Sequence, residues 1–181
     1  MFVTLIIESF YFMLPAYIAN MAPVLVQHQL KMLAVPVDLG CTFRKRPIFG
    51  SHKTYRGIIF ATLFGMLVFF LQKFLMAYPF FASISIVDYT TISLWLGFLL
   101  GFGAIMGDLI KSFFKRQKDH PPGVPWIPFD QLDYVAGALL FSALVYVPSW
   151  QHILAIILVS FLLHIVANHL GYYLGIHDVK W

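Results

Sequence analysis

The sequence has 181 residues, of which 60% are hydrophobic and only 11% are charged, and its net charge is +4. The mean hydropathy of +0.82 lies well above that of soluble proteins, and the length suits a single domain over residues 1–181. The apolar residues form continuous runs of about 20, the length of a membrane-spanning helix. This pattern predicts an all-α integral membrane protein and excludes a β-barrel, whose segments alternate in polarity.

Five apolar segments are expected to cross the membrane as helices, at about residues 2–20, 57–72, 90–107, 133–147 and 150–174. The first has no basic region before it and reads as a retained span rather than a cleaved signal peptide. Residues 24–35 are too short and too polar to span, so they are predicted to form an interfacial amphipathic helix. Two small-xxx-small pairs in the third span, typical of close packing between membrane helices, are formed by Gly97, Gly101, Gly103 and Gly107.

The basic residues indicate an orientation in the membrane. Ten of the twelve Lys and Arg residues fall within 31–56 and 108–133, so both segments are expected to be cytoplasmic loops. With five spans, the N terminus lies outside and the C terminus in the cytoplasm. We therefore expect a multi-pass protein of the cell membrane with a polar site facing the cytoplasm.

The stretch 107–133 holds four acidic residues, four basic residues and four prolines in 27 positions. If the third helix continues past Gly107, Asp108, Lys111, Ser112 and Lys115 share one helical face. The alternative is a local ion pair at a helix end, worth only a few tenths of a kcal/mol. An acid at membrane depth is costly without a partner or a purpose, which favours a functional role.

Asp130 and Asp133 are three residues apart, so both carboxylates can face one point at the start of the fourth helix. The alternative is N-capping, which explains one aspartate better than two. Together with Asp108 they offer three carboxylates near one interface, which suits Mg²⁺, a hard ion that prefers oxygen ligands and bridges carboxylates to phosphates. The sequence thus predicts a magnesium site formed by Asp108, Asp130 and Asp133.

Further polar residues flank this stretch. Lys53 and Arg56 stand one turn apart at the start of the second helix and are expected to face the same anion. The segment 44–46 is either a topology signal attracted to anionic headgroups or part of the site. Asn20 is either a helix-end polar group or a site residue, and Trp126 is expected to anchor the membrane interface rather than stack on a base.

Several other chemistries find no support in the sequence. His164 and His169 point about 140° apart on a helix and no HExxH motif occurs, which disfavours a zinc site. The sequence also lacks a GxxxxGK[ST] loop and a GxSxG elbow. Cys41 is the single cysteine, so no intramolecular disulfide is possible.

The order of these motifs resembles a known group of enzymes. GDLIKSFFKR followed by PPG and DQLD resembles the signature of the CDP-alcohol-forming cytidylyltransferases, and NMAP at 20–23 and PIFGSHKTYRG at 47–57 resemble its small archaeal branch, the CDP-archaeol synthases. The signature positions are Gly107, Asp108, Ser112, Lys115, Arg116, Pro122, Gly123, Asp130 and Asp133. Three departures from the bacterial branch also favour the archaeal one: Lys111 where an acid is usual, Gln131 in place of a basic residue, and GVPWIPF in place of a Gly/His-rich loop.

This resemblance implies transfer of CMP from CTP to the lipid phosphate 2,3-bis-O-geranylgeranylglycerol 1-phosphate, with release of pyrophosphate and with Mg²⁺ as cofactor. It implies catalytic roles for Asp108, Asp130, Asp133 and Lys115, and substrate binding by Lys53, Arg56, Lys111, Ser112, Arg116 and Asn20. The expected partners are CTP, an isoprenoid ether lipid phosphate and the bilayer, with a possible homodimer and no nucleic acid.

Two other classes stay open at this stage. A small transporter or channel for an anionic solute predicts polar residues deep within several spans, whereas here they cluster toward one face. A lipid-binding scaffold without catalysis leaves the three aspartates unexplained.

Overall fold

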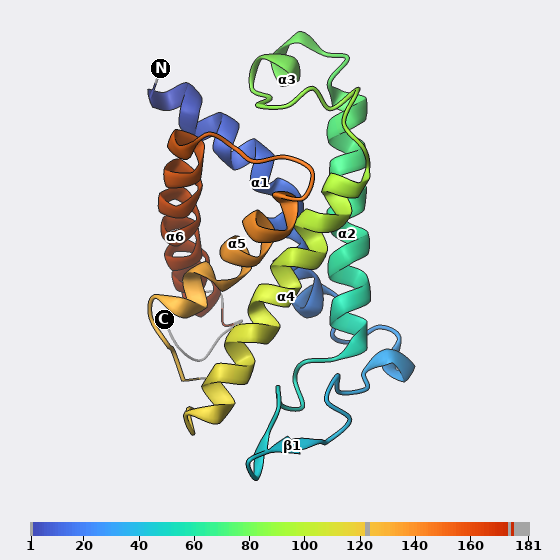
Figure 1. The fold of residues 1–181 in the computed structure, drawn as a ribbon, viewed down its shortest axis with the longest axis vertical. Coiled ribbons are helices and arrows are strands. Elements are labelled where there is room, and N and C mark those ends of the chain that lie inside the picture. The colour runs from blue at the N-terminus through green and yellow to red at the C-terminus, as the bar shows by residue number, and fades with distance from the viewer. Residues whose placement is uncertain (1, 122–123, 174, 176–181) are drawn as a thin grey trace.

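The computed structural model describes residues 2–121, 124–173 and 175, and these form a helical bundle (Figure 1). The helices are α1 (Phe2–Leu25), α2 (Tyr55–Leu75), α3 (Pro79–Ser83), α4 (Trp95–Gln117), α5 (Phe129–Ser142) and α6 (Trp150–Tyr173). A 3₁₀ turn, η1 (Lys31–Leu33), and an antiparallel hairpin of β1 (Thr42–Phe43) and β2 (Arg46–Pro47) lie between α1 and α2. The all-α prediction is confirmed, with this short hairpin as an addition.

Four of the described helices, α1, α2, α4 and α6, are long and apolar enough to cross a membrane. Helix α5 has 14 residues, about 21 Å of helix, against a hydrocarbon core about 30 Å thick. The segment 143–149 continues from its end toward the start of α6 at the opposite end of the molecule (Figure 1). The predicted helix 133–147 is therefore helical for only part of its path, and the number of spans and the orientation of the termini stay predictions.

Helix α4 is the central element of the bundle. In its most apolar 18-residue window 56% of residues are buried, compared with 22% in α2 and 17% in α6. The outer faces of α2 and α6 expose large apolar side chains such as Leu67 and Leu162, which suits contact with lipid. The core contains Phe12 of α1, Leu100 of α4 and Val135 of α5. Helix α4 is thus the most enclosed of the four candidate spans.

The glycines of α4 allow two helices to approach it closely. Gly97 and Gly101 face α2, and Gly103 and Gly107 face α5. A Cβ atom on Gly101 would lie 3.1 Å from a backbone Cα atom of α2, and one on Gly107 would collide with the backbone carbonyl of Asp133. The predicted small-xxx-small packing is therefore confirmed. It brings the start of α5 directly against the end of α4 that carries the charged residues.

Two predicted boundaries were wrong for reasons that involve distant contacts. The segment 24–35 is not an amphipathic helix, because α1 runs on to Leu25 and the chain then turns through Leu30, which has a positive φ of 40°. Arg56 of α2 holds this turn by donating to the carbonyl of Gln29 at 2.7 Å. The outcome is a tight connection between α1 and the loop before α2.

Helix α4 begins and ends later than the predicted 90–107. Before Trp95 the chain is a loop, which the Lys73 ammonium holds by bonds to the carbonyls of Tyr89, Thr90 and Ile92. At the other end the helix runs on to Gln117, so the charged residues after Gly107 are helical. The tail beyond Gly175 and the predicted Pro122 and Gly123 lie outside the described residues.

Candidate active site

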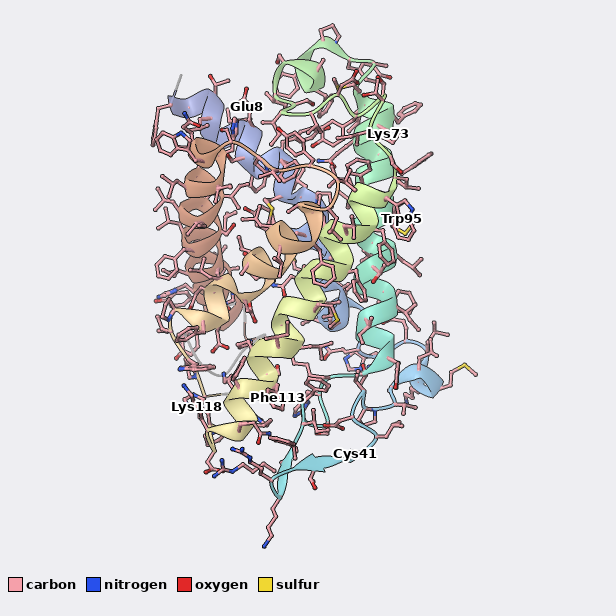
Figure 2. All side chains as sticks on the ribbon, in the orientation of Figure 1. Glu8, Cys41, Lys73, Trp95, Phe113 and Lys118 are labelled. Atoms are coloured by element: carbon pink, nitrogen blue, oxygen red, sulfur yellow. The ribbon has the colours of Figure 1, made fainter. Side chains whose placement is uncertain are left out.

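A charged cluster lies on α4 toward the end of the molecule where Figure 2 labels Phe113 and Lys118. Asp108, Lys111 and Lys115 share one helical face, as predicted from their spacing, whereas Ser112, predicted on the same face, lines a different cavity. The Lys111 Nζ atom lies 3.2 Å from Oδ1 of Asp108. The three side chains face the start of α5.

Helix α5 contributes two carboxylates to the same cluster. The Lys111 Nζ atom lies 2.9 Å from Oδ1 of Asp130 and 2.8 Å from Oδ2 of Asp133, and Lys115 donates to Asp130 at 3.0 Å. Neither aspartate is the N-cap residue of α5, which is Pro128. Asp130 lies in the first turn of α5, where the helix dipole also favours it, so the alternative covers Asp130 in part and does not account for Asp133. Instead, one lysine ammonium joins all three carboxylates.

Lys53 approaches the cluster from the loop before α2. Its ammonium pairs with Asp108, whose side chain is 13% exposed. Arg56 does not join it, because its guanidinium turns to the carbonyl of Gln29 and is buried there. The expectation that Lys53 and Arg56 face one anion is not met in this structure.

The carboxylates line a pocket of about 210 Å³ to which α1 and α6 also contribute. Asn20 of α1 lies there, so the structure brings this predicted residue to the site. His164 and Asn168 of α6 line the same pocket, and sequence reasoning missed both. Their four-residue spacing was the available signal, because it places both side chains on one face of the helix.

A second, larger cavity of about 670 Å³ lies on the side of α4 that faces the loop before α2. It is lined by four cationic residues and one carboxylate, together with two histidines and several small residues; the charged ones are Lys45, Arg46, Lys53, Arg116 and Asp119. We call it the basic cavity. The predicted residues Ser112 and Arg116 both line it, but sequence reasoning missed His52 and His120. The buried Nε atom of Arg116 has no hydrogen-bond partner among the described residues.

A third cavity, which we call the apolar groove, has a volume of about 570 Å³ and runs between α4 and α5. It is lined mainly by apolar residues: Ile110, Phe114, Trp126, Pro128, Phe129, Leu132, Ala136 and Leu140. Lys111 and Asp133 also line it and connect it to the carboxylate pocket. The Lys118 ammonium lies 5.0 Å from the centre of the Trp126 ring.

Helix α4 thus separates two cavities of opposite character. Ser112 and Arg116 face the basic cavity, whereas Ile110, Phe114 and Lys118 face the apolar groove. Within each set the spacing is four residues, so each forms one row along the helix. The row of Asp108, Lys111 and Lys115 lies between these two rows. A polar ligand and an apolar ligand can therefore meet at the carboxylates.

The three aspartates fit a magnesium ion by the nature of their oxygens. Oδ2 of Asp133 is buried and lies 2.8 Å from the Lys111 ammonium. Among the described residues, however, no three acidic, histidine or cysteine side chains are already placed to hold an ion. The Lys111 ammonium lies between the carboxylates. A bound cation therefore requires Lys111 to move aside.

Comparison with known proteins decides the family. The sequence profile of the CarS-like family, described as CDP-archaeol synthase, matches residues 2–181. The chain belongs to the CDP-archaeol synthase family. It is 37% identical to the CDP-archaeol synthase of Methanocaldococcus jannaschii over 100% of both chains. It is also 36% identical to that of Pyrococcus furiosus, over 97% of this chain and 98% of the relative.

A solved structure described as an intramembrane enzyme for archaeal membrane lipid biosynthesis has a similar fold. Its TM-score is 0.71 at 30% identity, over 90% of this chain and 94% of that chain. Like its family, the chain is a multi-pass membrane enzyme of the cytidylyltransferase class, as its sequence predicted. The name CDP-archaeol synthase implies CTP and a lipid phosphate as substrates, which favours the enzyme over the transporter and scaffold hypotheses.

Proposed function

We propose that this chain transfers CMP from CTP to 2,3-bis-O-geranylgeranylglycerol 1-phosphate, forming a CDP-activated ether lipid and pyrophosphate at the cytoplasmic face of the cell membrane. The main support is the division of space by α4. The basic cavity suits a soluble polyanion, the apolar groove suits isoprenoid chains, and the carboxylate row lies between them. The family membership supports the same reaction.

The chemistry needs alignment more than proton transfer. A phosphate oxygen of the lipid attacks the α-phosphorus of CTP, the bond between the α-phosphorus and its bridging oxygen breaks, and pyrophosphate leaves. A phosphate monoester is largely ionised at neutral pH, since its second pKa is about 6, so the nucleophile needs no strong base from the protein. The site must bring two anions together and offset their charge.

The residues of the basic cavity are suited to hold the triphosphate. Lys53 of the loop before α2 and Arg116 of α4 both line the cavity, and Ser112 adds a hydroxyl group. The Arg116 guanidinium lines the cavity, and its fork of donors suits phosphate oxygens. Lys115 is held by Asp130 and by the carbonyl of Val124 at 2.7 Å, which fixes its charge next to the carboxylates.

Asp108, Asp130 and Asp133 would hold magnesium. When bound, the ion would supply charge neutralisation for the triphosphate and the leaving pyrophosphate. Lys111 lines both the carboxylate pocket and the apolar groove, so once displaced from the carboxylates it can contact the lipid phosphate. The magnesium requirement and the homodimer remain predictions.

The apolar groove would hold the lipid chains while the phosphate reaches the carboxylate row. Its lining is almost entirely apolar along Phe114, Phe129 and Leu140, so isoprenoid chains can pass from the bilayer into the groove without exposure to water. Lys118 lies at the same groove beside Trp126. It can attract the anionic head group as the lipid enters.

The experiment is an assay of the purified protein with CTP and Mg²⁺, in which pyrophosphate and the CDP-lipid are both measured. The geranylgeranyl ether phosphate and phosphatidate are supplied in parallel. With the ether lipid we expect pyrophosphate and CDP-lipid to form in equal amounts. With phosphatidate we expect both products to form more slowly. Solute uptake into proteoliposomes without nucleotide turnover would contradict the proposal and revive the transporter hypothesis.

A further inference from the structure

Asp38 is a buried carboxylate in the loop between α1 and α2. It is 8% exposed, and the ion pairs among the described residues do not include it. A buried charge without a counterion is costly unless hydrogen bonds compensate for it. The loop must therefore supply hydrogen-bond donors to the Asp38 carboxylate.

Three backbone amides converge on this carboxylate from two separate parts of the loop. Oδ1 accepts from the amide of Gly40 at 3.1 Å, and Oδ2 accepts from the amides of Phe49 and Gly50 at 3.0 and 2.9 Å. Burial alone would raise the pKa of Asp38, but the three hydrogen bonds outweigh burial and hold the pKa below its usual range. The carboxylate is thus ionised at any pH at which the enzyme is assayed.

The second part of this loop is one wall of the basic cavity. Phe49 and Gly50 line the cavity between Lys45 and Lys53. Gly50 has a φ of +94° and lies against the Arg116 side chain, which would be 3.8 Å from a Cβ atom added there. The Asp38 carboxylate therefore fixes the backbone at the point where the loop meets Arg116.

We propose that Asp38 is a positioning residue of the CTP site: its carboxylate holds the 49–50 backbone so that the cations of the loop and Arg116 face one anion. This inference rests on the proposed function. The three amide donors partly offset the negative charge of the carboxylate. A ready-made cavity also avoids the entropic cost of ordering the loop each time CTP binds.

The test begins with Asp38→Asn, which keeps the size of the side chain. An amide is uncharged and has a single acceptor oxygen, so it cannot accept from all three backbone amides, and the bonds that it keeps lose the strength that a carboxylate gives them. Hydrogen exchange at Gly40, Phe49 and Gly50 should become faster, by at least about tenfold where the acceptor is lost. The KM for CTP should rise about tenfold while kcat stays within about twofold, because the loop orders the cavity rather than the reacting atoms.

Two further variants keep the test decisive. Asp88→Asn is the matched control, because Asp88 also accepts a backbone amide in a loop, from Thr90 at 2.9 Å, but at the opposite end of the molecule. It should leave the KM for CTP unchanged. Gly50→Ala keeps Asp38 but strains the left-handed backbone, and it should raise the KM for CTP in the same way even if Asp38→Asn folds poorly.

The outcomes separate this inference from the proposed function. If the wild type shows no CTP turnover with lipid phosphate, the proposed function fails, whereas the exchange rates still report whether Asp38 orders the loop. Unchanged exchange at Gly40, Phe49 and Gly50 in Asp38→Asn would overturn the inference. A lower melting temperature with an unchanged KM for CTP would also overturn it, because that is the result of a purely structural role.

Discussion

Lys111 connects the three carboxylates of the candidate site, and this network sets what single substitutions can do. Its side chain is 14% exposed and lies within 3.2 Å of an oxygen atom of each aspartate. Removing one partner from a buried ionic network costs about 3–5 kcal/mol, because the remaining charge is left without compensation. Substitutions here must therefore be assessed for folding as well as for activity.

Lys53 and Arg56 are both basic and stand three positions apart, but Lys53 pairs with Asp108 whereas Arg56 donates to the carbonyl of Gln29. Lys53→Met should reduce kcat/KM for CTP by about 100-fold, since it removes a cation of the basic cavity next to Asp108. Arg56→Met should mainly lower the melting temperature, because the lost contact is the one to Gln29. Thermal unfolding gives the melting temperatures of both variants, and steady-state kinetics gives their kcat/KM for CTP. Equal losses of kcat/KM in the two variants would contradict the placement of Arg56.

Some features of the site could be predicted from the sequence, and others depend on contacts between distant residues. The face shared by Asp108, Lys111 and Lys115 followed from residue spacing alone, because helical periodicity is local. The inclusion of Asn20 in the carboxylate pocket and the exclusion of Arg56 depend on tertiary packing. The hairpin could not be predicted from its turn residues. Arg44 and Lys45 adopt positive φ angles of 53° and 65°, which glycine or asparagine usually adopts in such turns.

At the scale of elements, the site depends on the close approach of α4 and α5. Gly107→Ala should displace Asp133, because the new Cβ atom collides with the backbone carbonyl of that residue. We expect a loss of kcat of at least about tenfold along with lower thermal stability. Gly97→Ala is the control in the same helix, since its Cβ atom meets Phe69 of α2, far from the carboxylates. It should lower stability with little loss of kcat in the folded fraction, and an equal loss of kcat would contradict this account.

Among the described residues, the basic cavity, the carboxylate pocket and the apolar groove all lie toward one end of the molecule. Cys41 lies at the end of the basic cavity, whereas Glu8 and Lys73 lie at the other end (Figure 2). The overall class and the polar end could be predicted from sequence, because apolar runs and basic loops are composition signals. The partition by α4 could not, because three cavities arise only when α4, α5 and the loop before α2 come together.

The single exposed cysteine provides a direct test of orientation. We expect a membrane-impermeant maleimide to label Cys41 in inside-out vesicles and not in intact cells. Moving the cysteine to the other end, with Cys41→Ser and Asp88→Cys combined, should reverse the pattern. Labelling of Cys41 from outside the cell would contradict a cytoplasmic site.

The most direct test of the central claim is pyrophosphate release by Asp133→Asn in the assay with CTP, Mg²⁺ and the geranylgeranyl ether phosphate. Asp133 meets Lys111 at the junction of the carboxylate pocket and the apolar groove, so loss of its charge should nearly abolish release while Asp88→Asn retains it. Thermal unfolding confirms that both variants are folded. Full activity of Asp133→Asn would contradict the assignment of this cluster as the site of CMP transfer.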